Sequence, residues 1–234
     1  RLGDRAREAV TLSNLGRVHA RQGDFPTAIQ HMEKALAVQQ EIQDLAAAAA
    51  TLDSLGNLYR QLRQWETSSQ YLEAAIRIHQ QVMNVAGEAQ ALSNLGLVYR
   101  AQEQNEQAMQ YYEQALTLHE KVGNKSGMAS TLNNIGVVHR AREEYEQALE
   151  IYQRVLILRR EVQDISGEAT TLNNIGRVYR LTNQVDRAME YYQKSLALLK
   201  QTGDRVNEAT ILSNIAMLHI EAQQWSEAEK NLEA

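Results

Sequence analysis

The sequence predicts an all-α fold, a solenoid of six helix-turn-helix repeats of which the last is truncated. A five-residue pattern (leucine, two small polar residues, leucine or isoleucine, then glycine or, in the last copy, alanine) recurs every 40 residues without a shift. Its copies start at Leu12, Leu52, Leu92, Leu132, Leu172 and Leu212. The composition is rich in alanine, leucine, glutamine and glutamate, with one proline, which favours helices. Within each copy, the first leucine and the leucine or isoleucine three residues later have the spacing of residues on one face of a helix.

The first helix of each repeat, helix A, is predicted from about position 5 to 22 and from the equivalent positions 40 residues apart. An aspartate or asparagine precedes each one and is suited to cap its first turn. These residues are Asp4, Asp44, Asn84, Asn124, Asp164 and Asp204. Within helix A, Leu12, Leu15 and His19 stand at i, i+3 and i+7 and form one apolar stripe.

An elbow, Gly23-Asp24 in the first repeat, separates helix A from a second helix, helix B, over about 25–42. Pro26 fits the first turn of helix B. Gly3, Gly123 and Gly203 precede the caps and are expected to end the preceding helix in a left-handed conformation. The glycine in the middle of helix A, such as Gly16, costs helix propensity, so we expect helix B to cross closely there. Helix B supplies a small residue and then a bulky one at this crossing.

The repeats predict one array over residues 1–234, divided at about 4–43, 44–83, 84–123, 124–163, 164–203 and 204–234. Because the chain begins at Arg1 and stops inside the sixth repeat, we expect it to be part of a longer protein. An uncapped last repeat exposes apolar surface, so Trp225, Leu218 and Leu232 are expected to be partly exposed and to favour weak self-association.

The leucine-glycine pair, a tyrosine three residues later, and an alanine and a bulky residue in the next helix resemble the tetratricopeptide repeat (TPR). The resemblance covers the whole chain. The period of 40 departs from the commonest period of about 34 and is similar to that of Pins-type adaptors, kinesin light chains and bacterial signalling arrays. It implies a right-handed superhelix whose A helices line a concave groove, and a peptide-binding or scaffolding role.

Helical geometry places positions 10, 13, 14, 17, 20 and 21 of each repeat on one face of helix A, opposite the apolar stripe. Position 14 carries asparagine in five repeats: Asn14, Asn94, Asn134, Asn174 and Asn214. Position 13 adds the small polar residues Asn133 and Asn173. Carboxamides both donate and accept, as an extended peptide backbone requires, and the TPR resemblance supports this role. The alternative is that the amides bridge neighbouring helices.

Arginines form the sharpest charged feature of the same face. Arg60, Arg100, Arg140 and Arg180 share position 20, and Arg17 and Arg177 share position 17. Guanidinium groups bind carboxylates in a bidentate manner, so we expect an acidic or carboxylate-bearing peptide. The alternative is that each arginine pairs with an acid of a neighbouring helix B, the candidates being Glu66, Glu106, Glu146 and Asp186.

Position 17 carries apolar residues in the middle of the chain, Leu97 and Val137. They could receive an apolar side chain of the peptide between the arginine-rich flanks. The alternative, which we favour slightly, is that they pack against adjacent A helices.

Other functional classes find little support. The chain has no cysteine, which excludes a thiolate zinc site, and no i, i+4 histidine pair that could hold a metal. It also has no phosphate-binding glycine loop. We therefore expect no enzymatic activity, cofactor or metal. The net charge of −5 and the absence of a long apolar run argue against nucleic-acid and membrane partners, and we expect a cytoplasmic protein. The predicted function is that of an adaptor or scaffold. The alternatives are a structural or self-associating spacer in a larger signalling protein and, less favoured, a nucleic-acid-binding protein.

Overall fold

The structure, a computed structural model, describes residues 2–221. These residues form eleven α-helices in two compact units. The first unit, Arg1–Asn124, contains α1 (Leu2–Arg21), α2 (Phe25–Glu41), α3 (Leu45–Gln61), α4 (Trp65–Gln81), α5 (Val85–Ala101) and α6 (Asn105–Lys121). The second, Lys125–Ala234, contains α7 (Lys125–Ala141), α8 (Tyr145–Glu161), α9 (Ile165–Leu181), α10 (Val185–Thr202) and α11 (Arg205–Glu221).

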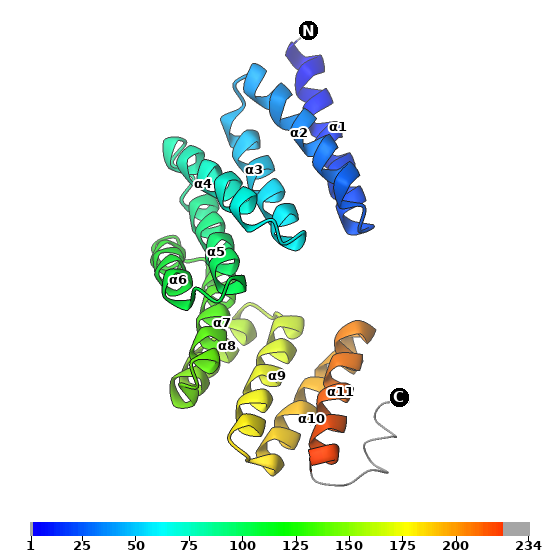
Figure 1. Cartoon of the computed structure of the whole chain (residues 1–234), viewed down its shortest axis with the longest axis vertical. Helices are drawn as coiled ribbons and strands as arrows, with labels where there is room; N and C mark the ends of the chain where they lie inside the picture. The colour runs from blue at the N-terminus through cyan, green and yellow to red at the C-terminus, as the bar shows by residue number, and fades with distance from the viewer. Residues whose placement is uncertain (1, 222–234) are drawn as a thin grey trace. The chain divides into compact units, whose positions relative to one another are not determined.

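Odd-numbered helices are the predicted A helices and even-numbered helices are the predicted B helices. Within each unit, an A helix packs along its own B helix and against the B helix of the preceding pair (Figure 1). The predicted all-α repeat architecture is therefore confirmed. The predicted second helix of the sixth repeat lies outside the described residues.

The predicted caps explain where the later A helices begin. The side chain of Asp44 accepts a hydrogen bond from the backbone N–H of Ala47 at 3.1 Å, and Asn84 and Asp164 do the same for Gly87 and Gly167, at 3.0 and 2.8 Å. Each cap satisfies a backbone donor that has no partner inside its helix. In the first repeat the prediction is wrong, because α1 begins at Leu2 and thus contains both Gly3 and Asp4.

The elbows share a residue in the left-handed backbone conformation, which the sequence predicts only where that residue is glycine. Gly123 and Gly203 adopt left-handed φ values of 66° and 70°, as predicted, and so does Gly23 at 81°. The same slot is left-handed in seven further elbows without glycine: Gln43, Arg63, Met83, Glu103, Glu143, Gln163 and Asn183. A residue with a Cβ atom pays a steric cost in this conformation. The repeat geometry therefore imposes the turn, and glycine is not required for it.

Replacing Met83 by glycine is expected to stabilise the first unit by about 0.5–1 kcal/mol. Glycine relieves the strain of the left-handed conformation, and this gain exceeds the cost of the greater conformational entropy of glycine in the unfolded chain. Met83 has φ 55° and an 86% exposed side chain, so little packing is lost. Urea unfolding measures the effect. The control is Arg77→Gly on the exposed side of α4, which should destabilise by about 1 kcal/mol. Equal losses in both variants would contradict the interpretation.

The mid-helix glycines lie where helix B crosses helix A, as predicted. A Cβ atom built on Gly16 or Gly56 would come within 2.7 Å of Met32 or 2.6 Å of Leu72. On Gly96, Gly136 and Gly176 it would meet the ring carbons of Tyr112, Tyr152 and Tyr192 at 2.5–2.6 Å. All three tyrosines are fully buried. Glycine is thus needed to let the bulky residue of helix B reach the core.

The apolar stripe of helix A is covered by the B helix of the preceding repeat. Leu55 and Leu58 pack on Ala28 and Met32 of α2, and both are at most 3% exposed. In α1, the first A helix, the equivalent residues Leu15 and Val18 are 41% and 49% exposed. At the other end, Leu218 is fully buried in the cluster around Tyr192, so its predicted exposure is wrong. Trp225 and Leu232 lie outside the described residues.

Candidate functional site

The candidate site is the polar face of the A helices, defined here by positions 10, 13, 14, 17 and 20 of each repeat, and is described separately for the two units. In the second unit, asparagine amides connect adjacent A helices across this face. Asn174 of α9 donates to the Oδ1 of Asn133 of α7 at 2.9 Å. Asn214 of α11 donates to the Oδ1 of Asn173 of α9 at 2.8 Å. The alternative of amides that bridge helices is therefore what these four residues do in the unliganded chain.

The asparagines at position 14 differ in how much hydrogen-bonding capacity they have left for a ligand. Asn94 and Asn174 are only 7% exposed, and Asn94 accepts a hydrogen bond from Gln90 at 3.3 Å. Asn14 is exposed and accepts a hydrogen bond from Arg17. Asn134 is half-buried, and no side-chain partner for it occurs among the described residues. Asn14 and Asn134 thus have the most free hydrogen-bonding capacity.

Two arginines of the first unit lie close together beside a buried tyrosine. Arg60 of α3 is half-buried, and its pKa is lowered first by burial and then by the neighbouring charge of Arg100 on α5. The hydroxyl of Tyr112 faces the same two guanidinium groups but forms no hydrogen bond within normal geometric limits. Burial raises the pKa of Tyr112 to about 12, and the two arginines oppose that rise. The phenol therefore stays neutral and does not compensate the positive charges.

The second unit gathers three arginines. The pKa of Arg177 on α9 is lowered first by burial and then by Arg140 on α7, with a smaller contribution from Arg180. Arg180 forms an ion pair with Glu221 at 2.6 Å. Arg140 keeps a buried Nε without a hydrogen-bond partner. One of the three arginines is thus neutralised by a carboxylate.

The alternative of pairing with acids of helix B is not seen for any of these arginines in the described residues, since Glu221, the partner of Arg180, lies on the A helix α11. Among the described residues, no carboxylate lies within ion-pair distance of Arg60, Arg100, Arg140 or Arg177. The charged group that lowers the pKa most, after burial, is Arg100 for Arg60 and Arg140 for Arg177. The polar face therefore holds uncompensated positive charge in both units, although the chain as a whole is acidic.

The two apolar residues of position 17 are both half-buried. Val137 packs against the cluster that contains Tyr152, Leu172 and Ile175, which agrees with the packing alternative. Leu97 lies on α5 in the other unit, so a common anchor formed by both residues stays a prediction.

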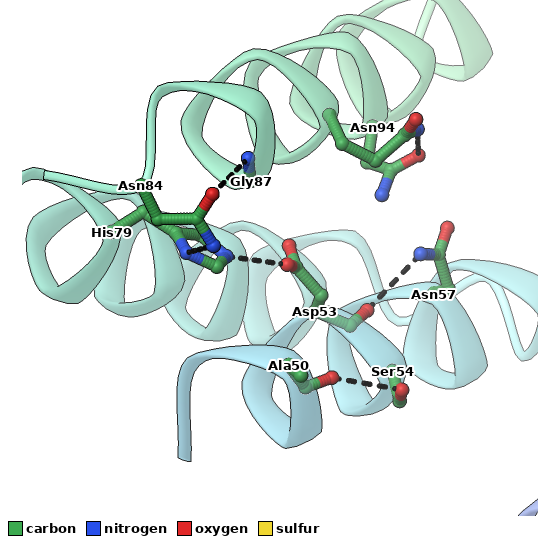
Figure 2. Close-up of polar contacts among 9 residues, drawn as sticks. Ala50, Asp53, Ser54, Asn57, His79, Asn84, Gly87 and Asn94 are labelled. Carbon is green, nitrogen blue, oxygen red and sulfur yellow. Dashed lines mark hydrogen bonds and ion pairs between the residues drawn. The ribbon is translucent and has the colours of Figure 1, made fainter. Parts of the chain in front are cut away.

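A polar network that the sequence did not predict joins three helices of the first unit. The Nε2 of His79 on α4 lies 2.9 Å from the Oδ2 of Asp53 on α3, and its Nδ1 lies 3.2 Å from the Nδ2 of Asn84. Asn84 at the same time caps α5 through Gly87 (Figure 2). His79 is 3% exposed, and burial raises the pKa of Asp53. The only available signal was an aspartate at position 13, where the other repeats have serine or asparagine.

Two classes of site are not seen among residues 2–221. These residues contain no group of three or more histidine, aspartate or glutamate side chains placed to hold a metal ion. None of their helices combines the length and the apolar character needed to cross a membrane.

Comparison with known proteins decides the family. The profile of the tetratricopeptide repeat matches residues 1–41, 46–121, 127–201 and 167–234. The chain belongs to the tetratricopeptide repeat family. No curated protein matches this TPR chain significantly.

Solved structures with the same fold share little sequence with this TPR chain. Aspartyl phosphate phosphatase F from Bacillus subtilis is 17% identical over 96% of this chain and 68% of its own, with a TM-score of 0.78. A kinesin light chain with nearly identical TPR-like repeats from Podosopora anserina is 16% identical over 86% and 98%, with a TM-score of 0.67. A Rap protein in complex with Competence and Sporulation Factor is 15% identical over 96% and 72%, with a TM-score of 0.71. At these identities the similarity establishes the fold alone.

Proposed function

We propose that this TPR chain is a protein-interaction module, an adaptor or scaffold, that binds an extended acidic segment of a partner protein on the polar face of its A helices. The observation that carries the proposal is that half-buried Arg60 and Arg177 have no carboxylate partner among the described residues, while burial and then the charges of Arg100 and Arg140, respectively, lower their pKa values. Like charges held together lower the stability of the free protein. A ligand that brings carboxylates would convert this repulsion into charge-assisted hydrogen bonds.

Backbone recognition would come from the amides. Asn14 and Asn134 have free hydrogen-bonding capacity, and Asn214 is half-buried beside Asn173. A carboxamide that bonds to a neighbouring helix still offers further donors or acceptors to a ligand. Family membership supports the general role, and the Rap protein solved with Competence and Sporulation Factor provides a precedent for a ligand on this fold.

Removing the arginines is expected to weaken binding without harming the fold. The double variant Arg60→Gln/Arg100→Gln should bind an acidic peptide at least tenfold more weakly, because two charge-assisted hydrogen bonds are lost. The same variant should unfold at an equal or higher urea concentration, because a repulsion between half-buried charges is removed. Fluorescence anisotropy with a labelled glutamate-rich peptide, repeated at increasing salt, measures the affinity.

The control is Arg77→Gln, which removes a positive charge from the exposed side of α4 in the same unit. It should leave affinity within about twofold, since long-range effects of exposed charges are screened by salt. Equal losses from the double variant and the control, or an affinity that does not fall with salt, would rule out the arginine site. In the second unit, Arg140→Gln/Arg177→Gln with Arg154→Gln as control provides the same comparison.

A further inference from the structure

The first unit contains a pocket that the sequence did not predict. It has a volume of about 230 Å³ and is lined by residues of α1 and α3 together with Met32 and Gln39 of α2. Its walls carry residues from positions 10, 13, 14 and 17 of the first repeat and small residues of the next repeat: Val10, Ser13, Asn14, Arg17, Ala47, Ala50, Thr51 and Ser54. The pocket therefore opens on the polar face proposed to bind the partner.

No pair of asparagine amides bridges the two A helices at the pocket. Between α9 and α11 the gap is spanned by Asn173 and Asn214. The equivalent residues between α1 and α3 are Ser13 and Ser54, which are shorter. The hydroxyl of Ser54 also turns back to the carbonyl of Ala50 on its own helix, at 2.9 Å (Figure 2).

The equivalent gap between A helices in the second unit can be compared with this pocket. The equivalent gap of the last described repeats, which Asn173, Leu199, Asn207 and Thr210 line, has a volume of only about 40 Å³. The larger side chains Asn207 and Thr210 stand there in the places of Ala47 and Ala50. Small residues at four positions thus open the pocket in the first unit.

The size of the pocket limits its occupant. Sites for complete small-molecule ligands usually have volumes of roughly 300–1,000 Å³, and this pocket is smaller at about 230 Å³. A single medium-sized side chain of a longer ligand fits it better.

The lining gives the chemical character of that side chain. Val10 is 59% exposed, and Met32, Ala47 and Ala50 add further apolar surface. Arg17 at the rim is the one charged residue of the lining. The combination suits an aliphatic side chain that is followed or preceded by a carboxylate.

We infer that this pocket is an anchor site for one aliphatic side chain, of about the size of leucine, next to an acidic residue of the bound segment. The inference rests on the proposed function, since it assigns a specificity-determining position within the same peptide. Burial of a leucine side chain contributes about 1.5–3 kcal/mol. Loss of that side chain from the peptide should therefore weaken binding at least tenfold.

A library of random dodecapeptides displayed on phage tests both ideas with one probe. Selection is carried out on the 234-residue chain, on Ala50→Leu, which fills the pocket, and on the control Thr117→Leu, which adds the same side chain to the exposed side of α6, outside the polar face of the A helices. Ser54→Asn, which restores the asparagine of the other five repeats, narrows the pocket by an independent route. Selected peptides are then compared with their leucine-to-serine versions by fluorescence anisotropy.

The expected result is enrichment of aspartate or glutamate together with an aliphatic residue at a fixed distance. The aliphatic preference should disappear in Ala50→Leu and in Ser54→Asn and persist in Thr117→Leu. Acidic peptides without an aliphatic preference, or a preference unchanged by both pocket variants, would overturn the anchor site and leave the proposed function in place. Selection without acidic enrichment would overturn the proposed function, and the anchor site with it.

Discussion

Replacing Gly96 by alanine is expected to destabilise the first unit by about 2 kcal/mol. Alanine gains up to about 1 kcal/mol of helix propensity over glycine, but its Cβ atom would lie 2.5 Å from the ring of Tyr112. That ring is fully buried. Overpacking of a dense core typically costs about 1–3 kcal/mol and outweighs the gain. Urea denaturation followed by circular dichroism measures the change.

Gly3→Ala is the matched control, because Gly3 also lies in an A helix but a Cβ atom there would meet nothing within 4 Å. This variant should keep or slightly raise the stability. If Gly96→Ala were as stable as the unchanged chain, the close approach of helix B would not be the reason for the conserved spacing of these glycines along the repeats.

Replacing His79 by leucine is expected to cost about 2–3 kcal/mol at neutral pH. The carboxylate of Asp53 would lose its hydrogen bond from His79, and its other oxygen is already buried without a partner. Removing one member of a largely buried polar pair leaves the other without compensation. Size is not the problem, because Leu199 occupies the equivalent position of the fifth repeat and is 2% exposed. The free energy of unfolding in urea is the measurement.

The double variant His79→Leu/Asp53→Ser is the control, because Ser13 and Ser93 already occupy the equivalent positions of the first and third repeats. It should recover most of the lost stability. The difference between the two variants should also depend on pH. Burial raises the pKa of Asp53 above its value in the unfolded chain, so ionisation of Asp53 opposes folding. Stability is therefore greatest below the unfolded pKa and is lost as the pH rises through the folded pKa.

The single variant should accordingly approach the double variant near about pH 4 and separate from it towards pH 7. A difference that is the same at both pH values would mean that the carboxylate of Asp53 is not the source of the loss.

In the candidate site, the sequence predicted the positions of the polar residues but not their hydrogen-bond partners. The positions of Asn174 and Asn214 on the polar face followed from helical geometry, but their hydrogen bonds to Asn133 and Asn173 did not. The partners lie 41 residues apart, and whether an amide faces its neighbour or the solvent depends on how closely two helices approach. For the same reason the sequence could not decide between free and paired arginines. Only the packed helices separate Arg60 from the acids of helix B and bring it near Arg100.

The sequence by itself determined the period, the helix pairs and the crossing at the glycines, because these depend on spacing along the chain and on side-chain size. The close contact between Gly96 and Tyr112 could be predicted, because a Cβ atom at position 96 would collide with the tyrosine ring. The tertiary structure alone decided which polar groups satisfy one another and where a gap stays open. The pocket beside Ser54 and the network around His79 each depend on side chains from three helices, and their contact follows from packing that no single repeat specifies.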